Sequence, residues 1–105
     1  MNMDRGESVI AMLRITRELT PSQRLVVMQY AAEVQDPGGT VRRKGQDLAA
    51  DIGMAPQMYS RVRLELVRAG WLREDENARI GNVRYYRLTA KADGPVSNVV
   101  PLQPA

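Results

Sequence analysis

The sequence of 105 residues contains no cysteine and no histidine. Without cysteine there is no disulfide and no thiolate metal site, and without histidine the usual general base and the commonest metal ligand are missing. No apolar run approaches the roughly 18 residues that a membrane span needs, and the first residues do not follow the pattern of a signal peptide. We therefore expect a cytoplasmic protein that is not an enzyme and needs neither a metal nor another cofactor.

The sequence also has little excess of positive over negative charge, with a net charge of only +3. The distribution is uneven, however. Residues 1–40 carry four arginines against five acidic residues, whereas residues 41–89 carry nine arginines and one lysine against six acidic residues, a net charge of +4. Arginine suits paired hydrogen bonds to phosphate and guanine. GC-rich codon usage would explain the preference for arginine over lysine but not its clustering, so we expect the second part of the chain to meet an anionic partner.

Residues 7–19 have the apolar spacing of a helix, with Ile10 and Ile15 at the flanks of one stripe. The stripe itself consists of Val9, Met12, Leu13, Thr16 and Leu19. This arc is wider than a lone surface helix requires. We therefore expect residues 1–19 to form a helix that is either covered by the rest of the chain or pairs with a second subunit. In the second case, the seam of a homodimer would contain Val9, Met12, Leu13 and Thr16.

A second helix is predicted from residue 21 to about residue 35. Thr20 and Gln23 have the spacing of a capping box, and Pro21 suits the first helical position. Apolar residues occupy nearly every side of this segment, which predicts the buried centre of the fold. The loop Asp36-Pro37-Gly38-Gly39 then ends the helix, and residues 40–42 could pair as a very short strand.

Residues 47–72, DLAADIGMAPQMYSRVRLELVRAGWL, predict two helices joined by a tight turn. Leu48, Ala49 and Ile52 form the inner face of the first helix, and Gly53 supplies a left-handed residue after its end. Pro56 opens a longer helix through residue 69, which Gly70 stops. Two helices joined by a turn of about three residues centred on glycine form a helix-turn-helix.

After residue 70 the apolar period becomes that of strands. Residues 71–75 and 83–88 are predicted to pair around a polar loop, residues 76–82, in which Gly81-Asn82 provides a turn. Residues 89–92 are compatible with a last helical turn. Residues 94–105 contain proline and no amphipathic period, so we expect a disordered tail. The predicted organisation is thus one domain, residues 20–93, between the first helix and this tail.

The order helix, helix, short strand, helix-turn-helix and hairpin resembles that of the winged helix-turn-helix family, over about residues 19–89. The resemblance is carried by Leu48-Ala49, Gly53, Leu66, Ala69-Gly70-Trp71-Leu72 and Arg87-Leu88-Thr89. The chain is most similar to bacterial MarR-type regulators and to the winged-helix domain at the front of phage and plasmid replication proteins. It departs from the family pattern at Ala55, where Ser or Thr is usual, at Met58-Tyr59, where Thr-Val is common, and at Arg63, where an aliphatic residue is usual. The resemblance implies a mainly helical α+β fold with a small hairpin wing, and binding to double-stranded DNA.

In such a domain the second helix of the motif, here about residues 56–69, lies in the major groove. We expect its core side to consist of Tyr59, Val62, Leu66 and Ala69. The opposite face then offers candidate DNA contacts at Gln57, Ser60, Arg61, Leu64 and Arg68. Arg61 suits the two acceptors of guanine, Gln57 suits adenine, and Ser60 suits either. Leu64 either meets a thymine methyl or is simply an exposed leucine.

Basic residues outside this helix complete the predicted interface. Arg42, Arg43 and Lys44 precede the first helix of the motif, where phosphate often meets backbone amides, although a solvated basic loop is the alternative. The wing, about residues 73–87, follows the backbone or minor groove, with candidate contacts at Arg79, Asn82 and Arg84. The acidic run Glu74-Asp75-Glu76 would be repelled by DNA, so we expect it to face away or to pair with neighbouring arginines.

The leading hypothesis is sequence-specific binding of double-stranded DNA by a nucleoid-associated, homodimeric transcriptional regulator, since pairing on a palindrome adds affinity and specificity. One alternative is a DNA-binding protein of plasmid or phage replication or partition. Another is a winged-helix module that binds proteins and not DNA. Single-stranded nucleic acid is disfavoured, because it requires several exposed aromatic side chains and the five aromatics of this chain occupy mostly core-like positions.

Overall fold

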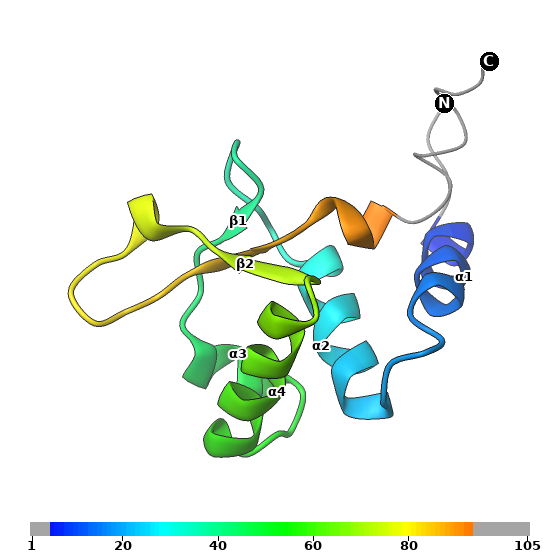
Figure 1. Ribbon diagram of the computed structural model, residues 1–105, viewed down its shortest axis with the longest axis horizontal. Helices are drawn as coiled ribbons and strands as arrows, with labels where there is room; N and C mark the ends of the chain where they lie inside the picture. Colours follow the sequence, from blue (N-terminus) through cyan, green and yellow to red (C-terminus); the bar gives the residue numbers. More distant parts are fainter. Residues whose placement is uncertain (1–4, 94–105) are drawn as a thin grey trace.

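The computed structural model describes residues 5–93, which form four α-helices and three short strands (Figure 1). In chain order these elements are α1 Arg5–Ile15, α2 Pro21–Ala32, β1 Thr40–Val41, α3 Gly45–Asp51, α4 Pro56–Arg68, β2 Leu72–Glu74 and β3 Tyr86–Leu88. Two 3-10 turns, Glu76–Ala78 and Ala90–Asp93, lie in the loop between β2 and β3 and after β3. Every predicted helix and strand is present, with shorter strands than expected. The predicted tail, residues 94–105, lies outside the described residues.

The three strands form one antiparallel sheet in the order β1-β3-β2. Val41 pairs with Tyr86 and Leu72 pairs with Leu88, so the central strand joins the loop after α2 to the hairpin. Figure 1 shows the β2–β3 hairpin reaching away from the helices on the side opposite α1. Helix-turn-helix, three-stranded sheet and projecting hairpin together make the fold a winged helix-turn-helix, as the sequence predicted.

The core lies between α2, α3, α4 and the sheet. On α4, Tyr59, Val62 and Leu66 are at most 3% exposed, and their spacing places them on one stripe of the helix. Ala69, predicted on the same stripe, is exposed. The reason is that α4 ends at Arg68, so Ala69 already belongs to the C-cap. The core is completed by Val26, Val27, Tyr30, Val41, Leu48, Ala49, Trp71 and Leu72.

Both helices of the motif end in the same glycine-dependent way. After α4, Gly70 has φ +87°, its N–H bonds to the Val67 carbonyl, and the Trp71 N–H bonds to the Leu66 carbonyl. After α3, Gly53 has φ +67°, with equivalent bonds from Gly53 to Ala50 and from Met54 to Ala49. This is the Schellman arrangement, which satisfies the last helical carbonyls and requires a left-handed residue. The two predicted glycine stops are therefore confirmed.

Helix α2 begins as predicted and ends earlier. Thr20 and Gln23 form both bonds of the capping box. The last residue is Ala32 rather than about residue 35, because the backbone is already extended at Glu33, with ψ 156°. The Gln35 side chain then donates a hydrogen bond to the Tyr30 carbonyl at 3.3 Å. The predicted place of this helix at the centre of the fold agrees with Val26, Val27 and Tyr30, which are buried in the core. Leu25 on the same helix is 44% exposed, however, so not every apolar residue of α2 is covered.

Helix α1 ends at Ile15 rather than at residue 19. The Thr16 hydroxyl donates to the Met12 carbonyl at 2.7 Å, and Nη2 of Arg24 donates to the Leu13 carbonyl at 2.9 Å. These side chains satisfy carbonyls at the end of the helix, which does not continue. Thr16 is fully buried inside the chain. It therefore does not belong to the predicted dimer seam, because no part of it can reach a second subunit.

A half-buried glutamine, Gln29, connects α2, α3 and α4. The Tyr59 hydroxyl on α4 donates to Oε1 of Gln29 on α2 at 2.7 Å. Nε2 of Gln29 donates to the Leu48 carbonyl on α3 at 2.8 Å. Burial raises the pKa of Tyr59, so its hydroxyl stays protonated and available as a donor. This pair of hydrogen bonds fixes both helices of the motif against α2.

Tyr59→Phe should lower the free energy of unfolding by about 1–2 kcal/mol, because it leaves Oε1 of the half-buried Gln29 without this donor. Urea denaturation measures the difference. Tyr85→Phe is the matched control, since the Tyr85 hydroxyl makes no hydrogen bond to the described residues and its removal should change stability by less than about 0.5 kcal/mol. Equal destabilisation of the two variants would contradict the importance of the Gln29 contact.

Candidate nucleic-acid interface

The outward face of α4 carries all five residues predicted for it. Gln57, Ser60, Arg61, Leu64 and Arg68 are exposed, whereas the opposite stripe is in the core. Pro56 occupies the first turn, and the capping residue Ala55 provides no side-chain acceptor. Leu64 is 47% exposed. The structure thus brings a mixed face of amide, hydroxyl, guanidinium and one apolar group to the surface of a single helix.

The basic residues before α3 differ in their surroundings. Nε of Arg42 donates to Asp36 at 2.8 Å. Nη1 of Arg43 bonds to Glu33, at the end of α2, and to Asp51, at the end of α3. Lys44 pairs with no carboxylate among the described residues. Arg42 and Arg43 therefore brace the loop and the adjoining helices, and Lys44 presents an uncompensated charge at the start of α3.

The wing ends in a two-residue turn. Ile80 and Val83 exchange backbone hydrogen bonds of 3.2 and 2.9 Å, and Gly81 between them has φ +59°. Such hairpin turns favour glycine because they need a left-handed residue. Asn82 belongs to this turn, and Arg84 is the residue after Val83. The turn thus carries the amide of Asn82, and the guanidinium of Arg84 lies between the turn and β3.

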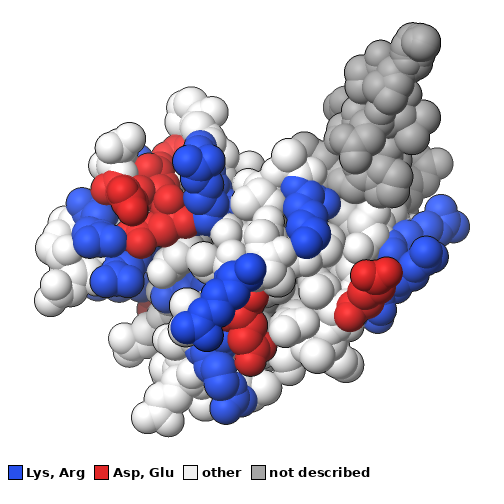
Figure 2. All heavy atoms as spheres, in the orientation of Figure 1, with Lys and Arg blue, Asp and Glu red and all other residues white. Residues whose placement is uncertain are grey.

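The acidic run of the wing is partly neutralised within the chain. Nε and Nη2 of Arg79 both donate to Oε2 of Glu74, at 3.0 and 2.6 Å, which confirms the predicted pairing with a neighbouring arginine. On the face shown in Figure 2, one group of acidic side chains lies on the side of the wing with basic side chains around it, and others lie apart from it. Arg79, a predicted DNA contact, therefore already has an anionic partner.

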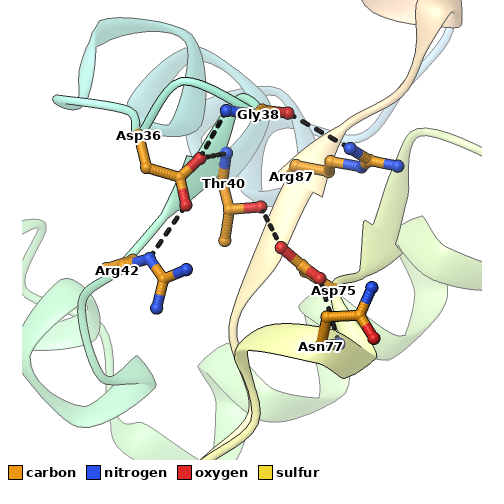
Figure 3. A network of polar contacts seen from close by, with 7 residues as sticks. All are labelled: Asp36, Gly38, Thr40, Arg42, Asp75, Asn77 and Arg87. Carbon is orange, nitrogen blue, oxygen red and sulfur yellow. Dashed lines mark hydrogen bonds and ion pairs between the residues drawn. The ribbon is translucent and has the colours of Figure 1, made fainter.

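Asp36 and Asp75 organise a polar network between the loop before β1 and the base of the wing (Figure 3). Oδ1 of Asp36 accepts from the Gly38 and Thr40 amides, both at 2.9 Å, and Oδ2 accepts from Arg42. The Thr40 hydroxyl donates to Asp75 at 2.7 Å, and Asp75 also accepts from the Asn77 amide. Nη1 of Arg87 donates to the Gly38 carbonyl at 3.1 Å. The network thereby anchors the wing to the motif.

The predicted cations thus fall into two groups. Arg42, Arg43 and Arg79 form ion pairs. Lys44, Arg61, Arg68 and Arg84 pair with no carboxylate within residues 5–93. The unpaired group comes from the start of α3, the outward face of α4 and the wing. These are three elements of one motif, so the fold presents uncompensated positive charge along all of them.

One arginine has a position that the sequence did not predict. Arg63 departs from the family pattern, and in the structure it points inward, between α4 and the sheet. Its guanidinium lies over the ring of Tyr86. Burial raises the pKa of Tyr30, and the positive charge of Arg63 nearby partly offsets this rise. The sequence contained one sign of this inward position. Arg63 follows the core residue Tyr59 by four residues, and this spacing places both side chains on one side of the helix.

A hollow of about 650 Å³ lies beside the wing and is lined by charged side chains of both signs, among them Arg73, Glu74, Glu76 and Arg87. Small-molecule sites are mostly lined by apolar and aromatic groups, so this hollow does not have the lining of a small-molecule site.

Within residues 5–93, no cluster of acidic side chains could hold a metal ion. In the same range, no helix has the length and apolar character of a membrane span.

Asp36→Ala should destabilise the protein at neutral pH and much less in acid. Hydrogen bonds from the Thr40 amide and from Arg42 hold the pKa of Asp36 below its usual range. A lowered pKa in the folded state gives stability that is complete above the unfolded value of about 3.9 and is lost as the pH falls through the folded value. Denaturant unfolding at neutral pH and near pH 3 measures this.

Glu18→Ala is the control for this prediction, because Glu18 is exposed and has no ion pair with the described residues. Its replacement should have little effect at either pH. A difference between Asp36→Ala and the unmodified protein that does not change with pH would show that the charge of the carboxylate contributes nothing.

No family model matches the sequence, and no curated protein matches it either. Among solved structures, the adhesin competence repressor AdcR from Streptococcus pyogenes is similar in fold, with a TM-score of 0.57 and 18% sequence identity. The superposition covers 88% of this chain and 65% of that one, so this chain spans slightly less than two thirds of that protein's length. At this identity the likeness concerns the fold alone, and it supports the winged helix-turn-helix architecture described above.

Proposed function

We propose that this protein binds double-stranded DNA sequence-specifically and regulates transcription as a homodimer. The observation that carries the proposal is the distribution of unpaired cations: Lys44, Arg61, Arg68 and Arg84 lie on the three elements with which a winged helix meets DNA. Positive charge without an internal partner is available to phosphate. The similarity in fold to a protein named as a repressor is consistent with this proposal.

In this proposal, the outward face of α4 lies in the major groove. Arg61 donates to the two acceptors of guanine, Gln57 pairs with adenine, and Ser60 bonds to either base. Leu64, which is 47% exposed, contacts a thymine methyl. Arg68, about two turns after Arg61, reaches phosphate where the helix leaves the groove.

Residues outside α4 would contribute backbone contacts. Lys44 meets phosphate at the start of α3, and Asn82 with Arg84 follows the backbone or the minor groove from the wing. Arg42, Arg43 and Arg79 hold carboxylates in the free protein. They reach phosphate only by exchanging these partners, so their contribution to affinity is smaller than that of the unpaired cations.

The homodimer would form through α1. Val9, Ile10 and Leu13 are between 38% and 47% exposed, although all are large and apolar. Met12 is only partly buried and packs against the core beneath them. A second copy of α1 would cover this stripe, and two-fold symmetry would then place two recognition helices on successive half-sites of a palindrome.

A second candidate function is binding of a protein partner without DNA. It is favoured by the exposure of Met58 and Leu64 on α4, at 37% and 47%. Binding to random duplex DNA with a steep dependence on salt separates the two functions, because only the first depends on phosphate contacts. Genome-wide mapping of bound sites separates transcriptional regulation from replication or partition, since it shows whether the sites lie in promoters or at origins.

Arg61→Ala should flatten the preference at one base pair of each half-site, because a paired contact to guanine contributes about 1–3 kcal/mol of discrimination. Non-specific binding should be almost unchanged. Arg68→Ala is the matched comparison on the same helix and should weaken binding to all sequences without altering the motif. Selection of bound sequences from a random pool tests both variants. Recovery of an unchanged motif with Arg61→Ala would contradict the placement of α4 in the groove.

Leu13→Asp should convert the dimer into monomers, because a carboxylate buried in an apolar interface is costly. Sedimentation at micromolar protein concentration measures the change. Val34→Asp is the control, since Val34 is apolar and 85% exposed but lies after α2 and outside the proposed seam. This control should stay dimeric. A monomeric unmodified protein under the same conditions would rule out the α1 interface.

A further inference from the structure

The inward position of Arg63 connects the recognition helix to the wing. Arg63 is half-buried on α4. Its guanidinium carbon lies 4.3 Å from the centre of the Tyr86 ring and 5.7 Å from the centre of the Tyr59 ring. Tyr86 is the first residue of β3, and Arg84 precedes it by two residues. The stacked guanidinium therefore joins α4 to the strand that returns from the tip of the wing.

The same guanidinium also packs against α3. A Cβ atom added to Gly45, the first residue of α3, would lie 2.8 Å from Nη1 and 3.0 Å from Nη2 of Arg63. Real Cβ atoms do not approach so closely, so the guanidinium occupies the space that a side chain at residue 45 would need. Arg63 thus touches all three parts of the proposed interface: α3, α4 and the wing.

Stability alone does not account for an arginine at this place. Nη1 of Arg63 is buried and has no hydrogen-bond partner among the described residues. Burial of such a donor without a partner is unfavourable. Attraction to the faces of two tyrosine rings offsets part of the penalty. That attraction depends on geometry, because the planar guanidinium must lie flat against the ring.

We propose that Arg63 is a positioning residue that fixes the wing relative to the recognition helix through Tyr86, and so sets where Arg84 meets the DNA. The geometric part of this proposal concerns the free protein. Its consequence for DNA binding rests on the proposed function. Replacement of Arg63 by methionine should leave the fold intact while the wing adopts a shifted or broader range of positions.

Distances between spin labels in the free protein test the geometric part. Because the chain contains no cysteine, the exposed residues Ala55, before α4, and Glu76, in the wing, can be labelled selectively as Ala55→Cys and Glu76→Cys. We expect one narrow distance distribution with Arg63 and a shifted or broader one with Arg63→Met. Tyr86→Leu and Gly45→Ala should produce the same change, because the first removes the ring on which the guanidinium stacks and the second places a methyl group in its space.

Two further variants separate positioning from charge and from general disruption of structure. Arg63→Lys keeps the charge without the planar group, so it should behave like Arg63→Met. Arg68→Met is the same substitution at an exposed site of the same helix and should leave the distances unchanged. An unaltered distribution in Arg63→Met, with the urea midpoint of the unmodified protein, would overturn the proposal.

The salt dependence of DNA binding tests the consequence. Arg84→Ala should lower the slope of log K against log salt by roughly 0.9 for each phosphate that is no longer neutralised. Arg63→Met should lower it by the same amount, and the double variant should fall no further. Additive decreases would show that Arg63 itself contacts phosphate and would overturn the positioning role. If the unmodified protein binds no duplex DNA, the proposed function fails, while the label distances still decide the role of Arg63.

Discussion

The hydrogen bonds of Gln29 set the relation between the three helices on which the interface depends. Because Gln29 accepts from Tyr59 and donates to the Leu48 carbonyl, α3 and α4 are both fixed against the same residue of α2. Tyr59 then contributes twice, since its hydroxyl belongs to this contact and its ring lies beside the guanidinium of Arg63. The direction in which α4 presents its outer face therefore depends on these polar contacts together with the apolar core around them.

Two kinds of arginine make up most of the positive charge of this domain. One kind directs its hydrogen bonds to the chain itself, as Arg43 does by joining the ends of α2 and α3. The other kind, represented by Arg61, extends from an otherwise rigid helix without an anionic partner among residues 5–93. The first kind braces segments that adjoin those carrying the second, as Arg79 does in the wing beside Arg84. A modest net charge is therefore compatible with unpaired cations on the motif, because acidic side chains pair with the arginines that brace it.

Local signals in the sequence were enough to predict the fold. The features that could not be predicted depend on contacts between residues far apart in the chain. The capping box at Thr20 and the glycine stops at Gly53 and Gly70 each depend on a few adjacent residues, and all three are confirmed. The burial of Thr16 depends on α2, whose Arg24 contacts its hydroxyl. The ion pairs of Arg43 likewise join residues from two different helices. Periodicity identified the outward face of α4, but it could not show which cations find carboxylates elsewhere or that Arg63 would stack on β3.

Asp36 also determines how this protein can meet other chains. Its backbone N–H donates to the Thr40 carbonyl, and its carboxylate accepts from the Thr40 amide. Asp36 thereby occupies backbone groups of β1 that an edge strand otherwise offers to a neighbouring molecule. The opposite edge, β2, has only three residues, and two of them, Arg73 and Glu74, are charged. Both borders of the sheet therefore resist extension by an added strand.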